Sequence, residues 1–377
     1  MSHTFNISRC STVVFNNVED MIAADQDPLN SCAYGRVNNP TSRCFEEAMA
    51  TLEHGFKAVT APSGLSAITM CFMALVRSGG HVLIADDVFG GVKRFAQEVL
   101  HRLDIEIEYY RSGHVEDICQ RVKSNTQIIY VESPSYFKGR ITDIAQLREN
   151  VKSGNLAIIA DNTWASPCYA NPLEQGADIS LHSVSKYIGG HSDVVLGVAV
   201  CNETTWEKVK LNAFYQGIHV SPDDVYLAWR GLQTLKVRMA QLSRSAYQIA
   251  YWLTQHPQVL DVYYPALKTH PDHDLWSRLF LGASGRFAIR LSSMTNQEIT
   301  ERLNTMQHFK LGYGWGGYSS LIAPRELPSK ESKALNNVTL MLSIGLEDVN
   351  NLIDDLEHLL TFKTHKYQQG EKRLINS

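Results

Sequence analysis

The feature that most constrains the fold is a series of short apolar segments that alternate with helical segments through the middle of the chain. Most of these segments are continuous hydrophobic runs, which is typical of strands buried on both faces of a parallel or mixed sheet. The stretches between them, such as residues 66–77 and 91–102, have helical periodicity. The alternation predicts an open α/β fold. The predicted strands are 81–85, 105–110, 127–133, 156–161, 178–183 and 194–200.

The pattern changes after about residue 231, where a long helical segment precedes shorter strands and a final helix. A chain of 377 residues is too long for one ordinary core, so two domains are expected. The first 35 or so residues have no strong periodicity and are expected to form an arm. The predicted later elements are a helix over 232–256, strands near 287–291 and 340–344, and a helix near 349–360. The predicted units are an arm over 1–37, a large domain over 38–231 and a smaller α+β domain over 232–377.

Composition excludes several classes of protein. The net charge of −4 gives no reason to expect nucleic acid or an anionic membrane as a partner. The chain contains no apolar run of the roughly 20 residues that cross a bilayer and no signal-peptide pattern at its start, so a cytoplasmic location is expected. Seven cysteines without a Cys-x-x-Cys pair predict free thiols and no metal site. A His/Asp-rich segment at 270–274 is interpreted as a polar loop rather than a metal cluster.

The first candidate for chemistry is Lys186, which follows the predicted strand 178–183. A lysine just past the carboxyl end of a strand points into the crevice where α/β sheets bind ligands. Ser183 and Ser185 supply hydroxyl groups close to this amine. A pyridoxal 5′-phosphate (PLP) enzyme needs this combination, an amine for a Schiff base and donors for the cofactor phosphate. Taken alone, the pattern is weak, because a solvated loop lysine would have the same sequence.

Two further segments fit the same cofactor. Asp161 ends another predicted strand, and a carboxylate there can keep the pyridine nitrogen of PLP protonated. Ser63, Gly64 and Leu65 begin the predicted helix near residue 66, where free backbone N–H groups can hold a phosphate. Each segment also has a purely structural interpretation, as a loop-capping Asp and a helix N-cap Ser. Their occurrence together is more informative than any one of them.

The chain resembles the Cys/Met-metabolism family of PLP enzymes, most closely its bacterial cystathionine β-lyases. The resemblance extends from near residue 10 to near residue 360, and the segment around Lys186 is highly specific. It implies a PLP-dependent transferase-like large domain with a mostly parallel, seven-stranded sheet. The segments that carry the resemblance are 34–36 (YGR), 63–65 (SGL), 160–164 (ADNTW), 183–193 (SVSKYIGGHSD), 315–318 (WGGY) and 342–348 (LSIGLED).

The resemblance implies a role for each matching residue. Lys186 would carry PLP as a Schiff base and move protons, and Asp161 would pair with the pyridine nitrogen. Tyr34 and Arg36 would reach the cofactor of a neighbouring subunit, with Tyr34 also serving in catalysis, which makes the expected assembly a dimer with shared active sites that forms a tetramer. The other implied cofactor residues are Ser63, Gly64, Leu65, Phe89, Ser183 and Ser185, and the implied substrate-pocket residues are Trp315, Met341 and Ser343.

The sequence departs from the family pattern at two positions. Phe89 stands where the family usually has a tyrosine that stacks on the cofactor, so stacking remains but the phenol group is lost. Met341 stands where the family usually has the arginine that binds the substrate α-carboxylate. Either the substrate carboxylate is modified or held differently, or another arginine has taken over, and Arg286, Arg290 and Arg325 are the candidates. Met341 could also simply fill a gap in the core.

The function that the resemblance implies is β-elimination from a sulfur-containing amino acid, as in transsulfuration. The alternative is γ-elimination or γ-replacement, including carbon–carbon or carbon–nitrogen bond formation in a specialised pathway, and both departures favour it. A PLP-binding scaffold without turnover is the third hypothesis. Retention of Lys186, Asp161 and Arg36 argues against that scaffold. The glycine-rich run 312–317 lacks the β-α context of a dinucleotide site and is expected to line the substrate pocket.

Overall fold

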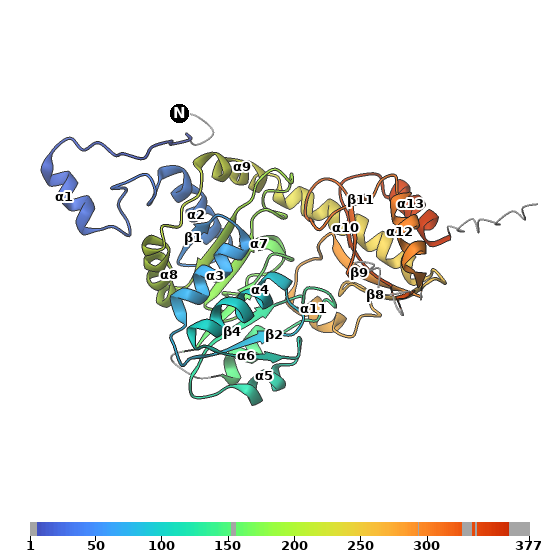
Figure 1. Cartoon of the computed structure of the whole chain (residues 1–377). Coiled ribbons are helices and arrows are strands. Elements are labelled where there is room, and N and C mark those ends of the chain that lie inside the picture. The colour runs from blue at the N-terminus through green and yellow to red at the C-terminus, as the bar shows by residue number, and fades with distance from the viewer. Residues whose placement is uncertain (1–5, 152–155, 293, 326–333, 336–337, 362–377) are drawn as a thin grey trace, which may run out of the picture.

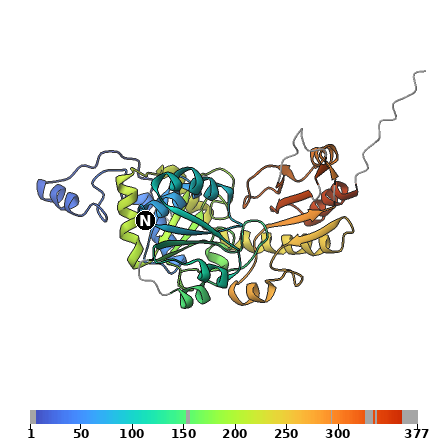
Figure 2. The same cartoon turned by 60° about the horizontal axis from the view of Figure 1, so that its bottom comes forward.

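The structure, a computed structural model, describes residues 6–151, 156–292, 294–325, 334–335 and 338–361. A central α/β body carries the N-terminal arm at one end and a smaller C-terminal unit at the other (Figure 1). The turned view in Figure 2 shows the same separation. Helix α10 (Leu235–Thr254) extends from the body along the C-terminal unit.

The body is built on a seven-stranded sheet in the order β1-β7-β6-β5-β4-β2-β3. Five of its strands, from β6 to β3, pair in parallel. Strand β7 is antiparallel to both β1 and β6. Strands β2 and β7 are buried along their whole length, which explains their continuous apolar sequences. The strands are β1 Lys57–Ala61, β2 His81–Ala85, β3 Glu106–Tyr110, β4 Thr126–Glu132, β5 Ala157–Asp161, β6 Ile179–Ser183 and β7 Gly197–Cys201.

Helices cover this sheet and complete its core. Side chains such as Phe72 and Tyr130 are fully buried between them, and each large apolar side chain contributes about 1.5–3 kcal/mol by leaving water. Helix α4 continues through a π-turn (Ala96–Leu100) and a 3-10 turn (His101–Leu103). The helices are α2 Pro40–Leu52, α3 Gly64–Leu75, α4 Gly90–Phe95, α5 Val115–Arg121, α6 Ile144–Asn150, α7 Ser166–Tyr169, α8 Glu203–Tyr215 and α9 Pro222–Leu232.

The C-terminal unit has its own sheet and its own hydrophobic core, packed against α10. The sheet order is β11-β12-β14-β9-β8, and β9 pairs antiparallel with β14 at its centre. A separate short ladder joins β10 to β13. The strands are β8 Val259–Tyr263, β9 Arg286–Leu291, β10 Met294–Thr295, β11 Lys310–Leu311, β12 Leu321–Pro324, β13 Ala334–Leu335 and β14 Val338–Ser343. The helices are α11 His273–Leu279, α12 Asn296–Asn304 and α13 Val349–Thr361.

The arm makes few apolar contacts with its own chain. Its helix α1 (Val18–Gln26) buries only Ala24 among its residues. Val14, Val18 and Met21 expose 89%, 61% and 51% of their surface. Exposed large apolar side chains in a contiguous segment are typical of a surface that another chain covers.

The predicted α/β class and the mostly parallel seven-stranded sheet are confirmed. Strand β1 and helix α1 were not predicted, and β7 begins at Gly197 rather than at 194. The long helix begins at Leu235 because α9 occupies the chain up to Leu232. The proposed division of the chain at 37 and 231 stays a prediction. Among the described residues, each helix is too short or too polar to cross a membrane.

Candidate active site

The candidate acid and the candidate lysine lie at the carboxyl ends of adjacent strands. Asp161 ends β5 and Ser183 ends β6, and these strands pair in parallel with Asp161 opposite Leu181. Lys186 follows in the turn after β6, where its backbone N–H donates to the Ser183 carbonyl at 3.0 Å. The fold therefore brings Asp161 and Lys186 to the same edge of the sheet, where α/β proteins bind ligands.

The Asp161 carboxylate is held by hydrogen bonds on both of its oxygens. Thr163 donates to Oδ1 from its hydroxyl at 2.5 Å and from its backbone N–H at 3.0 Å. The Tyr130 hydroxyl donates to Oδ2 at 3.0 Å. Burial and the nearby Asp161 charge raise the pKa of Tyr130, so this hydroxyl keeps its proton and remains a donor. A carboxylate oriented in this way is ready to accept a further hydrogen bond from a protonated ring nitrogen.

The start of α3 and the end of β6 form a tight cradle. Ser63 caps α3 by accepting from the Ser66 N–H at 3.0 Å, which leaves the Gly64 and Leu65 N–H groups at the open end of the helix. A Cβ on Gly64 would lie 2.6 Å from the Ser183 Cβ and 2.7 Å from its Oγ. Only a glycine permits this approach, and the first-turn N–H groups beside a serine hydroxyl suit a phosphate.

Ser185 differs from Ser183 in its contacts. Its hydroxyl donates to the Leu196 carbonyl at 3.2 Å and accepts from the Leu196 N–H at 3.0 Å. These bonds tie the Lys186 turn to the segment that leads into β7. A phosphate contact from Ser185 would therefore compete with its bonds to Leu196, whereas the Ser183 hydroxyl faces Gly64.

Lys186 is a largely buried amine with a second cation nearby. Burial, and then the positive charge of Arg286, lowers the pKa of Lys186. Its Nζ lies 5.6 Å from the centre of the Trp315 ring. Gly316 brings this loop against the lysine, because a Cβ there would lie 2.7 Å from the Lys186 carbonyl carbon, and its φ of +82° favours glycine. A lowered pKa makes the amine a better nucleophile near neutral pH.

A cavity of about 280 Å³ lies next to Trp315, between the body and the C-terminal sheet. Trp315, Met341 and Ser343 all line it. Their predicted contact with the substrate stays a prediction. Part of the glycine-rich run, residues 312–315, forms one wall. Arg286 and Arg325 also line the cavity, whereas Lys186 adjoins it through Trp315.

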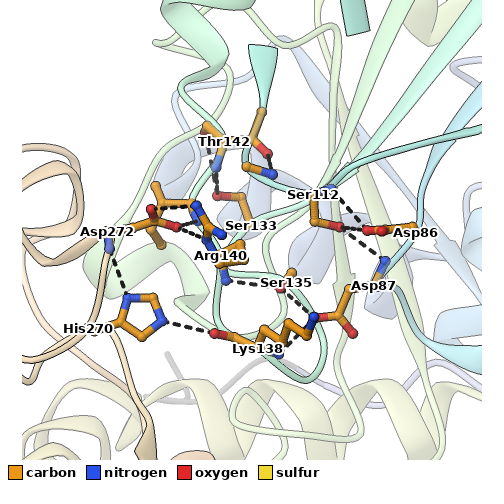
Figure 3. Close-up of polar contacts among 12 residues, drawn as sticks. Asp86, Asp87, Ser112, Ser133, Ser135, Lys138, Arg140, Thr142, His270 and Asp272 are labelled. Carbon is orange, nitrogen blue, oxygen red and sulfur yellow. Dashed lines mark hydrogen bonds and ion pairs between the residues drawn. The ribbon is translucent and has the colours of Figure 1, made fainter. Parts of the chain in front are cut away.

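The opposite wall comes from the loop after β4, whose position is fixed by charged residues (Figure 3). Asp87 accepts hydrogen bonds from Ser135 Oγ at 2.7 Å and from the Lys138 N–H at 2.7 Å. Arg140 forms an ion pair with Asp272 of the C-terminal unit at 2.5 Å. The loop therefore presents its aromatic residues, Tyr136 and Phe137, to the cavity from a position braced on both sides.

His270 completes this brace, which gives the His/Asp-rich segment a structural role. Its Nδ1 accepts from the Asp272 N–H at 3.1 Å, so Nε2 carries the proton and donates to the Lys138 carbonyl at 2.9 Å. Burial lowers the pKa of His270. The one cluster with metal-ligand geometry among the described residues is His81, Glu106 and Glu108, and Lys123 forms ion pairs with both of its carboxylates.

Phe89 lies at the start of α4, with its ring folded over Gly91. Its N–H donates to Glu132 Oε2 at 2.8 Å, and its ring centre is 5.9 Å from that of Tyr136. The side chain is 37% exposed. An accessible ring near the strand ends is suited to stacking on a planar cofactor.

The residues expected from a neighbouring subunit are not brought to Lys186 within one chain. Arg36 packs on α8, where its Nη1 donates to the Phe214 carbonyl at 3.2 Å and its guanidinium carbon lies 5.3 Å from the Phe214 ring centre. Tyr34 pairs with Thr12 in the arm and is 49% exposed. Their predicted role in a shared site stays a prediction.

Comparison with known proteins identifies the family. Residues 1–361 match the family described as "Cys/Met metabolism PLP-dependent enzyme". The chain belongs to this family. It is therefore an enzyme, and its cofactor is pyridoxal 5′-phosphate, as the resemblance implied.

Individual relatives of this family cover nearly the whole chain. Cystathionine beta-lyase MetC of Escherichia coli is 34% identical over 361 residues, which cover 93% of this chain and 91% of that protein. Cystathionine gamma-lyase of Dictyostelium discoideum is 34% identical over 339 residues, which cover 87% and 86% of the two chains. The crystal structure of metB from Corynebacterium glutamicum aligns with a TM-score of 0.86 and 30% identity, covering 95% and 93%. The family shares this architecture.

The residues of this chain fit the cofactor of the family. The Gly64–Ser183 cradle would close if a Cβ were added to Gly64, which is the geometry of a site that receives a small anionic group. The Asp161 carboxylate is oriented by Thr163 and Tyr130. Lys186 supplies the amine at the adjoining strand end. These residues would hold the phosphate, the ring nitrogen and the aldehyde carbon, a role that stays a prediction.

Sequence reasoning missed several residues that shape this family member's site. Tyr130, Thr163 and Glu132 orient the strand-end groups, and Tyr136 forms a cavity wall. Thr163 lies two residues after Asp161, a spacing that could have suggested a local turn. The other contacts join separate strands and loops, so they depend on sheet register.

Proposed function

We propose that this enzyme catalyses β-elimination from a sulfur-containing amino acid. The Cα–H and Cβ–S bonds break, the sulfur leaves as a thiol, and hydrolysis of the remaining enamine gives pyruvate and ammonia. The observation that carries the proposal is the buried Lys186 amine with a lowered pKa, beside a cavity for an amino acid. When bound, PLP supplies an aldehyde for the substrate amine and a ring that withdraws electrons from Cα.

Lys186 can perform the proton transfers of this reaction. Once the substrate amine has displaced it from the cofactor, its neutral Nζ can accept the proton from Cα. Burial and the charge of Arg286 favour that neutral form, because both lower the pKa of Lys186. The protonated Nζ can then donate to the departing sulfur. Phe89 has no hydroxyl with which to take this second role.

Asp161 keeps the electron-withdrawing ring charged. Its carboxylate is fixed by donors from Thr163 and Tyr130, so it does not need to reorganise when it pairs with a ring nitrogen. The Gly64 and Leu65 N–H groups and the Ser183 hydroxyl would hold the phosphate at the other end. These residues would hold the cofactor from both ends, on elements of the body that are themselves fixed by hydrogen bonds.

The cavity supports a substrate with an apolar thioether arm. Its walls include Phe137, Tyr313, Trp315 and Met341, which present aromatic rings and a thioether beside charged groups such as Asp87, Lys93 and Arg286. Such walls contact methylene groups and sulfur favourably. A volume of about 280 Å³ accommodates a small amino acid beside the cofactor site.

A second candidate is γ-elimination, in which the bond between sulfur and Cγ breaks. The observation that favours it is the equal identity, 34%, to a cystathionine beta-lyase and to a cystathionine gamma-lyase. The same lysine would have to move protons at both Cα and Cβ. The cavity walls alone do not distinguish these two paths.

Cystathionine distinguishes the candidates because its sulfur is bonded to a Cβ on one side and to a Cγ on the other. β-Elimination releases pyruvate and homocysteine, whereas γ-elimination releases 2-oxobutyrate and cysteine. We expect pyruvate as the keto acid, from cystathionine or from S-alkylcysteines, and none of it with Lys186→Ala. Release of 2-oxobutyrate without pyruvate across this panel would overturn the proposal.

A further inference from the structure

We infer that Arg286, on β9, binds the α-carboxylate of the amino-acid substrate. The residue takes over the task of the arginine that the family resemblance places at Met341. The inference deepens the proposed function but requires only that the substrate is a free amino acid. It therefore applies to β-elimination and γ-elimination alike.

The register of the C-terminal sheet places the two positions on one face. Arg286 pairs with Ser343, and Ala288 pairs with Met341, across the antiparallel strands β9 and β14. Alternate residues of a strand share a face, so Arg286, Ser343 and Met341 all face the cavity that they line. Diagonal neighbours in such a ladder are about 7–8 Å apart, which is within reach of an arginine side chain. The Arg286 side chain can therefore reach the part of the cavity beside Met341.

The Arg286 guanidinium has one end fixed and the other available. It is 95% buried, with a relative exposure of 5%. Nη1 donates to the Tyr136 carbonyl at 2.6 Å, and the guanidinium carbon lies 4.1 Å and 5.0 Å from the ring centres of Tyr136 and Trp315. Nη2 is buried and has no hydrogen-bond partner among the described residues. A buried, charged donor without a partner is costly, and a ligand carboxylate would satisfy it.

No acid in the described part of the chain neutralises Arg286. No described carboxylate lies within ion-pair distance of its guanidinium. Glu132 is close enough to feel its charge, but burial and Asp161 raise the pKa of Glu132 and favour its neutral form. Asp87 also lines the cavity, and its oxygens accept from the loop that carries Tyr136. The cation is thus held in place by aromatic rings and a carbonyl, with its charge left for a ligand.

The other two candidate arginines are placed differently. Arg290 forms an ion pair with Asp261 on the neighbouring strand β8, and it does not line the cavity. Arg325 is exposed, with its guanidinium carbon 4.2 Å from the Phe137 ring centre. Arg286 shares the Trp315 ring with Lys186, since its guanidinium carbon lies 5.0 Å and the Lys186 Nζ 5.6 Å from the centre of that ring. An α-carboxylate lies one bond from the carbon that carries the amine, so it needs a cation at that position.

The test compares two ligands that differ only in a carboxylate, L-norvaline and n-butylamine. Each displaces Lys186 from bound PLP, and the change in visible absorbance gives its affinity. Neither has a leaving group, so the result does not depend on the proposed elimination. The variants are Arg286→Gln, Arg286→Lys and Arg325→Gln, with Arg290→Gln as the matched control on the same strand. The absorbance of the lysine-bound cofactor shows that each variant is folded and loaded.

We expect Arg286→Gln to weaken L-norvaline binding by roughly tenfold to a hundredfold, in line with a charge-assisted hydrogen bond. Binding of n-butylamine should change less than about twofold, and Arg286→Lys should recover only part of the loss because its geometry differs. Arg290→Gln should leave both affinities unchanged. Equal loss for both ligands, no loss for either, or a selective loss in Arg325→Gln instead would overturn the inference.

Discussion

The two sides of the candidate active site differ in how closely they match the family pattern. On the side of the body, Lys186, Asp161 and the Gly64–Ser183 cradle retain the residues that the family resemblance implies for cofactor binding. On the side of the C-terminal sheet, the position expected to carry an arginine is Met341, and a buried arginine is found on the neighbouring strand. The first side therefore matches the family pattern in position as well as in chemistry, whereas on the second side the positive charge lies on β9 instead of β14.

This difference teaches where conserved chemistry needs fixed positions and where it needs only a fixed charge. A Schiff-base amine must reach one carbon atom, so its place on the chain cannot move. A carboxylate clamp needs a guanidinium in one volume of space, and two adjacent strands of one sheet both reach that volume. The predictions below separate the two sides, from the largest effect to the smallest.

Substitution of the lysine should abolish the function of the cofactor side. Lys186→Ala removes both the Schiff-base amine and the proton carrier, so turnover should fall by at least about a thousandfold. The visible absorbance of the lysine-bound cofactor should disappear, and borohydride should no longer link the cofactor covalently to the protein. A lysine-linked cofactor in peptide mapping of this variant would show that another residue carries it.

The arm should matter to the cofactor side through a second subunit. The smallest active form is expected to be a dimer, because Arg36 and Tyr34 lie away from Lys186 within one chain and the arm exposes apolar residues such as Val14. Deleting residues before Asn38 should weaken PLP retention by about tenfold, the value of one charge-assisted phosphate contact. The large domain should stay folded by circular dichroism. A fully active monomer in analytical ultracentrifugation would rule out a shared site.

A methyl group in the phosphate cradle should affect cofactor affinity alone. The added Cβ of Gly64→Ala would meet Ser183 at 2.6 Å, and overpacking of this kind costs about 1–3 kcal/mol, which corresponds to roughly fivefold to a hundredfold in Kd for PLP. The matched control is Gly312→Ala, on the substrate side, where the nearest atom lies 3.7 Å from the added Cβ. Titration of the apoenzyme with PLP measures both. Equal affinities in the two variants would mean that the cradle does not hold the phosphate.

The pH dependence of cofactor attachment should report the effect of the Arg286 charge on Lys186. Attachment requires the neutral Lys186 amine, and its lowered pKa extends attachment to a lower pH than for an ordinary lysine. Arg286→Gln removes a positive charge that contributes to this lowering. The pKa of Lys186 should rise, and the rate of attachment to apoenzyme should require a higher pH. An unchanged rate profile, with Arg290→Gln as control, would show that the two cations do not interact.

The sequence singles out the candidate residues of the cofactor side because they lie in contiguous segments. Lys186 with its flanking serines and the Ser63–Leu65 helix start are local patterns, and adjacent parallel strands bring Asp161 to the same edge. The substrate side depends on contacts between distant segments. Tyr136 approaches Arg286 from a loop that Asp87, Asp272 and His270 hold in place, and no local pattern encodes those long-range contacts. Sequence could name Arg286 as a candidate but could not select it from three arginines without the β9–β14 register.

The same limit applies to the fold. Continuous apolar runs located the central strands, because burial on both faces leaves a strong local signal. Strand β1 was missed since Lys57–Ala61 is short and contains a lysine and a threonine. Helix α1 in the arm was missed because its apolar residues are exposed and follow no buried face of their own chain.

The most direct test of the account exchanges the two positions across β9 and β14. L-Norvaline affinity and cofactor absorbance are measured together in Arg286→Met, Met341→Arg and the double variant. We predict that Arg286→Met binds L-norvaline at least about tenfold more weakly, and that adding Met341→Arg restores affinity to within a few-fold, with cofactor absorbance unchanged throughout. Full L-norvaline affinity in Arg286→Met, or a double variant no better than that single variant, would contradict the claim that the carboxylate site has moved from one strand to its neighbour.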